Sequence, residues 1–172
     1  PESRQALLLT AMEGFSDADT AAVMGIPGER IQPLLTEALA EIDRQTRTRV
    51  LVIEDEPLIA MDLTGIVQEL GHEVAAVART RADAVEAAIR EKPGLVLADI
   101  HLADGSSGID AVKDILASFT LPVIFITAFP QRLLTGERPE PTFLLTKPFD
   151  PRTVKAAISQ ALFFNSTASM AA

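Results

Sequence analysis

From residue 49 onward, short apolar runs alternate with stretches that carry apolar residues at helical spacing, and this alternation constrains the fold more than any other feature. The runs, rich in Val, Ile and Leu, fall at 49–54, 73–78, 94–98, 122–126 and 142–145. Helical spacing recurs at 59–70, 84–89, 109–116 and 154–162. Near-continuous apolar strands are buried on both faces, which is typical of a parallel sheet covered by helices. The sequence therefore predicts a five-stranded α/β domain over residues 49–163.

The first 42 residues carry helical signals only, and they predict a small all-α domain. A first helix ends near Gly14, and Ser16 begins a second as its N-cap, with Asp19 three positions on. The second helix ends at Gly25, and a third shows one apolar face over 31–42 with Pro33 near its start. Residues 43–48 are polar and aperiodic and are interpreted as a linker, and residues 164–172 as a flexible tail.

Composition excludes several classes of protein. The chain contains no cysteine, so it has no disulfide framework and no thiolate chemistry, which favours a reducing, cytoplasmic location. No apolar run approaches the roughly 20 residues that a membrane-spanning helix needs, and we expect no membrane partner. The net charge of −9 is unfavourable for binding nucleic acid or anionic lipid.

Polar side chains follow four of the predicted strands at the point where each strand ends. Glu54 and Asp55 follow the first strand, Asp99 the third, Thr127 the fourth and Lys147 the fifth. In a parallel sheet these ends meet at one edge, where the functional crevice lies. Any single one of these positions is explained as well by a solvated turn. Polar side chains at four strand ends along one edge of the sheet together predict a functional site.

These side chains suit the transfer of a phosphoryl group. Three neighbouring carboxylates repel one another unless a cation lies among them, and an all-oxygen cluster selects a hard ion such as Mg²⁺. Lys147 supplies a point charge and Thr127 a hydroxyl donor. A nucleophilic carboxylate, a screening metal and two groups that hold phosphoryl oxygens are the parts that such a reaction needs.

Residues 49–163 resemble the receiver domain of response regulators, through five motifs in the right order. The motifs are the acidic pair Glu54/Asp55, Asp99 in Ala-Asp-Ile-His-Leu, Gly108 nine residues on, Thr127 in Ile-Thr-Ala and Lys147 in Thr-Lys-Pro-Phe. The resemblance implies a flavodoxin-like fold with strand order 2-1-3-4-5. It also implies that Asp99 accepts a phosphoryl group from a histidine kinase or phosphotransfer protein.

The same resemblance implies a role for each site residue. Asp55, Asp99 and the backbone carbonyl of His101 would hold Mg²⁺, with Glu54 reaching the ion through water. Lys147 would bridge the acids or the phosphoryl group, Thr127 would swing toward the new oxygens, and the Lys147-Pro148 bond would be cis.

The family usually has an aromatic switch residue three positions before the lysine, and this chain has Leu144 there. Phe129 and Phe143 are the candidate substitutes. The segment 129–141 contains Gly136 and three prolines, which predicts a short or irregular fourth helix in the receiver.

The amino-terminal helices have the outline of a helix-turn-helix, which makes a DNA-binding two-component regulator the alternative function. Residues 1–44 carry eight acidic and three basic side chains, a net charge of −5. A recognition helix needs Lys or Arg to contact phosphates and bases, and the third helix offers only Arg30 near its start. DNA binding is therefore disfavoured.

The helical part resembles region 4 of an extracytoplasmic-function sigma factor over Ala-Leu-Leu-Leu at residues 6–9 and Glu13–Pro27. Where such sigma factors carry basic residues, this chain has Gln32, Pro33, Glu37 and Ala38. A sigma-like part followed by a receiver resembles the PhyR-type response regulators, although the sigma region-2-like part that opens those proteins is missing from this sequence.

The PhyR-type resemblance implies an anti-anti-sigma factor of the bacterial general stress response. Phosphorylation of Asp99 would release the sigma-like part to capture a NepR-type anti-sigma factor and free the sigma factor. A free-standing phosphatase or phosphotransferase is a third possibility, but His101 stands where a second catalytic carboxylate would be needed, two residues after Asp99. We therefore expect no enzyme beyond the uptake and loss of the receiver's own phosphoryl group.

Overall fold

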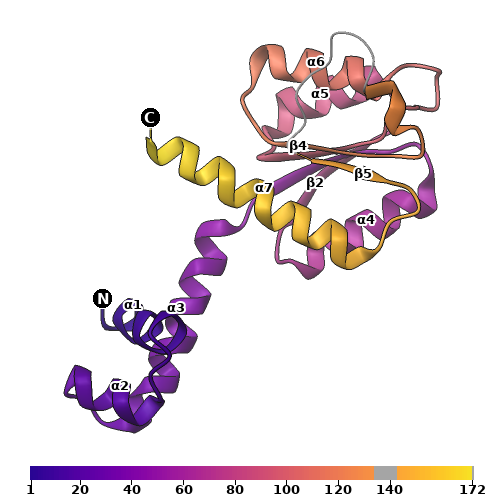
Figure 1. Cartoon of the computed structure of the whole chain (residues 1–172). Coiled ribbons are helices and arrows are strands. Elements are labelled where there is room, and N and C mark those ends of the chain that lie inside the picture. Colours follow the sequence, from indigo (N-terminus) through magenta and orange to yellow (C-terminus); the bar gives the residue numbers. More distant parts are fainter. Residues whose placement is uncertain (134–142, 172) are drawn as a thin grey trace. The chain divides into compact units, whose positions relative to one another are not determined.

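The computed structural model describes residues 1–133 and 143–171, which divide into two compact units, residues 1–47 and 48–172. Figure 1 shows the first unit as helices only and the second as a sheet with helices on both of its faces.

The helical unit contains three α-helices and two short irregular turns of helix. Its elements are α1 (Glu2–Leu7), the π-helical η1 (Leu8–Met12), α2 (Asp17–Met24), the 3₁₀ turn η2 (Gly28–Arg30) and α3 (Ile31–Thr46). Its buried apolar side chains come from all three helices, namely Ala6, Ala21, Ile31, Leu34 and Ala38. The predicted all-α fold of this part is confirmed.

The predicted boundaries of α2 follow from its caps. The Ser16 hydroxyl accepts a hydrogen bond from the Asp19 backbone N–H at 3.1 Å, which satisfies one of the free donors of the first turn. Gly25 ends the helix in the left-handed conformation at φ 67°, which costs glycine little because it has no β-carbon.

Helix α3 continues through Asp43–Thr46, where the sequence predicted the start of a linker. Residues 43–46 are therefore helical, because local side-chain hydrogen bonds take the place of apolar periodicity there. The two compact units still divide after residue 47, inside the range predicted as the linker. Arg44 and Gln45 both bond the Glu41 carboxylate, at 2.5 and 2.6 Å, and the Thr46 hydroxyl bonds the Ile42 carbonyl at 2.9 Å. Pairs spaced three and four residues apart stabilise a helix without any apolar contact.

The α/β unit contains a five-stranded parallel sheet in the order β2-β1-β3-β4-β5, as predicted. The strands are β1 (Arg49–Ile53), β2 (Glu73–Ala78), β3 (Leu95–Ala98), β4 (Val123–Thr127) and β5 (Phe143–Thr146). The helices are α4 (Pro57–Glu69), α5 (Arg81–Glu91), α6 (Gly108–Ser118) and α7 (Pro151–Ala171), with a 3₁₀ turn η3 at Pro130–Leu133.

Alternate residues of the central strands supply two hydrophobic cores, one on each face of the sheet. Leu51, Val96 and Phe125 pack with α5 and α6 on one face, whereas Val52, Leu97 and Ile124 pack with α4 and α7 on the other. Figure 1 shows these two helix pairs on opposite sides of the sheet. Burial on both faces explains why the strands read as unbroken apolar runs.

Helix α7 extends to Ala171, so the backbone of residues 164–171 is helical. The flexibility expected of this tail stays a prediction. The sequence there, Phe-Asn-Ser-Thr-Ala-Ser-Met-Ala, contains neither Gly nor Pro to end the helix. In the segment predicted to hold a short or irregular helix, the structure has η3, and residues 134–142 lie outside the described residues.

Candidate functional site

The side chains predicted to form a site project from the carboxyl ends of adjacent strands. Glu54 and Asp55 follow β1, Asp99 follows β3, Thr127 is the last residue of β4, and Lys147 directly follows β5. Since β1 pairs with β3, β3 with β4 and β4 with β5, the topology brings these ends together in sequence order. The parallel sheet is therefore what assembles the site.

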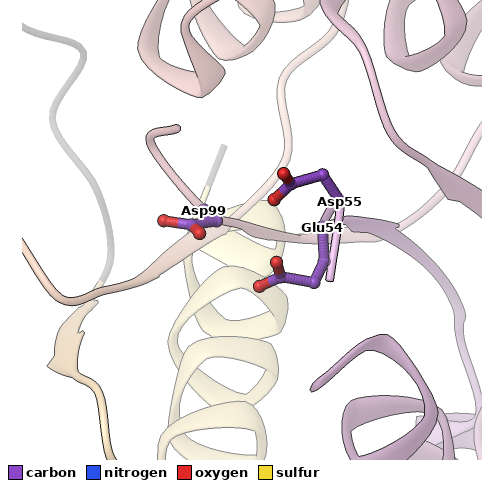
Figure 2. Close-up of side chains that lie close together, drawn as sticks. All are labelled: Glu54, Asp55 and Asp99. Carbon is purple, nitrogen blue, oxygen red and sulfur yellow. The ribbon is translucent and has the colours of Figure 1, made fainter. Parts of the chain in front are cut away.

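The three carboxylates Glu54, Asp55 and Asp99 form a cluster whose candidate ligand atoms lie within 4.8 Å of one another. Figure 2 shows Glu54 and Asp55 side by side at the end of β1, with Asp99 across from them at the end of β3. Glu54 and Asp99 are only 1 % and 7 % exposed, whereas Asp55 is half-buried. Closely spaced carboxylate oxygens of this kind match the hard-ligand preference of Mg²⁺.

Lys147 provides the cation among the carboxylates. Its Nζ atom lies 2.7 Å from Glu54 Oε2 and 2.8 Å from Asp99 Oδ2, and its side chain is only 10 % exposed. Burial acts to lower the pKa of Lys147, but the hydrogen bonds to Asp99 and Glu54 outweigh burial, so this pKa is raised. Lys147 is consequently charged at neutral pH and offsets part of the repulsion within the cluster.

Burial raises the pKa of Glu54, against the opposing effects of Lys147 and of the Glu56 backbone. Glu54 Oε1 accepts a hydrogen bond from the Glu56 N–H at 3.1 Å, so each of its carboxylate oxygens has a protein partner. The Glu56 side chain is 63 % exposed and lies 3.7 Å from Lys147, at the outer margin of the site. Sequence analysis did not select Glu56, because an acidic residue before a helix is common on a protein surface.

Asp99 is held by its own loop as well as by Lys147. Its Oδ1 atom accepts a hydrogen bond from the Ile100 N–H at 2.6 Å, which leaves Oδ2 for Lys147. Gly108, the first residue of α6, packs against this loop so closely that a β-carbon there would collide with the Asp99 carbonyl oxygen. The sequence shows the spacing of Gly108 from Asp99, whereas the close packing that requires a glycine there is visible only in the structure.

Thr127 is fully buried, and its hydroxyl accepts a hydrogen bond from the Phe129 backbone N–H at 3.2 Å. Its carbonyl accepts a hydrogen bond from the Lys147 N–H at 2.9 Å, which joins the ends of β4 and β5. The Lys147-Pro148 peptide bond is cis, as the receiver resemblance implied. The roles expected of Thr127 and of the His101 carbonyl remain predictions.

Sequence analysis also missed a contact between the loops that follow β3 and β4. The rings of His101 and Phe129 meet edge to face, with centroids 4.7 Å apart and planes at 87°. A contact between residues in two loops has no periodic signal in the sequence.

Both parts of the chain match families of known proteins. Residues 1–45 match the family model for the sigma-like domain of the response regulator PhyR, and residues 50–159 match the model for the response regulator receiver domain. The phyllosphere-induced regulator PhyR of Methylorubrum extorquens is 56 % identical over 98 % of this chain. The chain spans 63 % of the length of that relative.

Solved structures agree with these matches. The crystal structure of PhyR from Brucella abortus aligns with a TM-score of 0.69 at 59 % identity, covering 99 % of this chain and 70 % of that one. A PhyR from Bartonella quintana, crystallised in complex with the anti-sigma factor NepR, aligns with a TM-score of 0.65 at 58 % identity, covering 95 % of this chain and 68 % of that one. Among the residues described here, no helix is both long and apolar enough to cross a membrane.

Proposed function

This chain belongs to the response regulators of the PhyR type, and from that membership we propose that it is a phosphorylation-controlled anti-anti-sigma factor. The observation that carries the proposal is the Lys147 ammonium between Glu54 and Asp99, within a cluster of three carboxylates. An aspartate beside a fixed cation and two further acids is suited to receive a phosphoryl group.

Asp99 is the proposed phosphoacceptor. A carboxylate oxygen attacks the phosphorus of a phosphohistidine on a kinase or phosphotransfer protein, so a P–O bond forms as the P–N bond breaks. The departing imidazole nitrogen keeps the electron pair of the broken bond, and Asp99 becomes an acyl phosphate. Of its two oxygens, Oδ2 is the one that Lys147 holds, whereas Oδ1 is bound to the Ile100 N–H.

Lys147 and Thr127 would hold the new phosphoryl oxygens. The Lys147 ammonium is already 2.8 Å from Asp99, so it can exchange a carboxylate oxygen for a phosphoryl oxygen with little movement. The Thr127 hydroxyl lies at the end of the strand next to Asp99 and can donate its proton to a second oxygen.

The carboxylate cluster fits Mg²⁺, with Asp55, Asp99 and the His101 carbonyl as proposed direct ligands and Glu54 acting through water. The bound ion would supply positive charge that screens the repulsion between the acids and an incoming phosphoryl group. We infer that the receiver handles only its own phosphoryl group and turns over no external substrate.

The helical unit is the proposed partner-binding part. It matches the PhyR sigma-like domain while its first 44 residues carry a net charge of −5, so it can imitate a sigma factor without attracting DNA. The proposed partner is a NepR-type anti-sigma factor, as in the complex from Bartonella quintana. Because sigma factors and their regulators act beside the chromosome, we place this switch in the cytoplasm.

Phosphoryl uptake at Asp99 tests the proposed chemistry directly. After incubation with acetyl phosphate and Mg²⁺, intact-mass measurement should show the gain of one phosphoryl group, and chelation of Mg²⁺ should abolish it. The variant Asp99→Asn should gain nothing, whereas the control Asp62→Asn, at an exposed position of α4, should behave like the native chain. Equal uptake by Asp99→Asn would contradict the assignment.

A further inference from the structure

A side-chain contact joins the loop that contains Asp99 to the loop that follows β4. His101 lies two residues after Asp99 and Phe129 two residues after Thr127, and their rings meet edge to face at 4.7 Å. This geometry is the favourable one for aromatic rings, since the positive edge of one ring meets the negative face of the other. The contact therefore connects the loop of the proposed phosphoacceptor with the loop of Thr127.

Phe129 is also bonded to Thr127 through its backbone. Its N–H donates to the Thr127 hydroxyl at 3.2 Å. A hydroxyl can accept one hydrogen bond while it donates another, so Thr127 can bond a phosphoryl oxygen and still hold the Phe129 N–H. A movement of Thr127 toward Asp99 consequently carries the Phe129 backbone with it and shifts the Phe129 ring relative to His101.

Phe143 and Leu144, the other side chains considered for the switch role, lie in positions where a movement of Thr127 affects them less than it affects Phe129. Phe143 pairs in register with Ile124, three residues before Thr127 and about 10 Å away along the strand, and it packs against the core beneath α4 and α7. Leu144 packs against the opposite core. Phe129 is 46 % exposed, so a change in its position reaches the protein surface.

We propose that Phe129, packed against His101, is the positioning residue that couples Thr127 to the surface of the receiver. This inference rests on the proposed function, because it takes phosphorylation of Asp99 as the event that moves Thr127. The sequence offers both Phe129 and Phe143 as candidates for the aromatic switch residue, and this inference assigns that role to Phe129.

A single tryptophan can report this movement, because the chain contains no Trp and no Tyr. In Phe129→Trp, adding Mg²⁺ with beryllofluoride, a phosphoryl mimic, should change the emission as the ring leaves His101. In the matched control Phe143→Trp, the emission should stay the same. Adding His101→Leu to Phe129→Trp should remove most of the change, since the imidazole ring is then absent in both states.

Uptake of the mimic is measured separately by ¹⁹F NMR, so that two kinds of failure are distinguished. No bound beryllofluoride in the native chain would contradict the proposed function. If beryllofluoride binds, the role of Phe129 is overturned by either of two results. The emission changes equally in Phe129→Trp and Phe143→Trp, or it changes in neither variant. If Phe129→Trp does not fold, Phe129→Tyr carries the same measurement, because it is then the only tyrosine in the chain.

Partner binding gives a second readout that a purely structural role would not move. With a NepR-type protein as the titrant, Phe129→Ala should reduce the ratio of affinities with and without beryllofluoride by about two- to tenfold, the factor that an aromatic pair corresponds to. Phosphoryl uptake should be retained, and Phe129→Tyr should restore the ratio. An unchanged ratio in Phe129→Ala would contradict the proposal.

Discussion

Lys147 holds Asp99 by a hydrogen bond of 2.8 Å between Nζ and Oδ2, across 48 residues of sequence. The same ammonium group bonds Glu54 at 2.7 Å, and all three side chains are buried or nearly so. One cation therefore offsets two carboxylates in a region that water scarcely reaches, with Asp55 half-buried beside them. The site is incompletely neutralised as it stands, and this imbalance favours binding of a further cation.

Removing the Lys147 charge should destabilise the chain. At neutral pH, Lys147→Met should lower the free energy of unfolding by about 3 kcal/mol, because it leaves buried carboxylates without a cation. Adding Glu54→Gln should recover part of the loss, and Mg²⁺ should stabilise Lys147→Met more than it stabilises the native chain. Urea unfolding followed by circular dichroism provides these values.

The control for this variant is Lys155→Met, which removes a surface ion pair. Lys155 lies 2.6 Å from Glu69, but the Glu69 side chain is 65 % exposed, so the change should stay below about 1 kcal/mol. Equal losses in the two variants would show that Lys147 has no special electrostatic role.

Glu54 should make the native chain less stable as the pH rises. Burial raises the pKa of Glu54 in the folded state above its ordinary value of 4.5, so the folded chain binds its proton more tightly than the unfolded chain does. The contribution of Glu54 to the stability of the folded chain is fully present below pH 4.5. It is lost as the pH rises through the raised pKa of the folded state. The stability of Glu54→Gln relative to the native chain should therefore increase from about pH 4 to about pH 7, measured by urea unfolding. A relative stability that falls over this range would show that the pKa of Glu54 is lowered.

Gly108 should tolerate no β-carbon. Gly108→Ala forces a collision with the Asp99 backbone carbonyl, so we expect a loss of about 1–3 kcal/mol in unfolding free energy and slower phosphoryl uptake. Gly65→Ala is the matched control, because Gly65 lies inside α4 with open space around it. That control should stabilise the chain by about 0.5–1 kcal/mol. Calorimetric melting of both variants compares them, and a stable Gly108→Ala would refute the close packing.

The acidic helical unit should not retain DNA. Its net charge of −5 over residues 1–44 repels phosphates most strongly when salt is low. A gel-shift assay with random duplex at low ionic strength should therefore show no retained complex. Retention that weakens as salt is added would favour a DNA-binding regulator instead.

The sequence predicted the sheet and the position of the site because both depend on local patterns. Unbroken apolar runs marked the strands, and residues such as Asp99 and Lys147 stood out at their ends. Once parallel pairing is assumed, strand ends converge without further information. The same patterns did not indicate helix at Asp43–Thr46 or after residue 163, where helices continue without an apolar stripe.

The parts of the site that escaped prediction are contacts between loops. The ring contact between His101 and Phe129 depends on how two turns close after different strands, and the tight packing of Gly108 on Asp99 depends on where α6 begins. Neither has a periodicity or a charge pattern that marks it. Such contacts become visible only when backbone positions are known.

Calorimetric titration with a NepR-type anti-sigma factor tests the central claim most directly. With Mg²⁺ and acetyl phosphate, the affinity of the native chain should rise by about tenfold or more, within the usual range of coupling between sites. Asp99→Ala should bind the partner with the same affinity with and without the phosphoryl donor. An equal rise in the affinity of Asp99→Ala would contradict control through Asp99. The same holds if the affinity of the native chain does not rise although its mass shows that it carries the phosphoryl group.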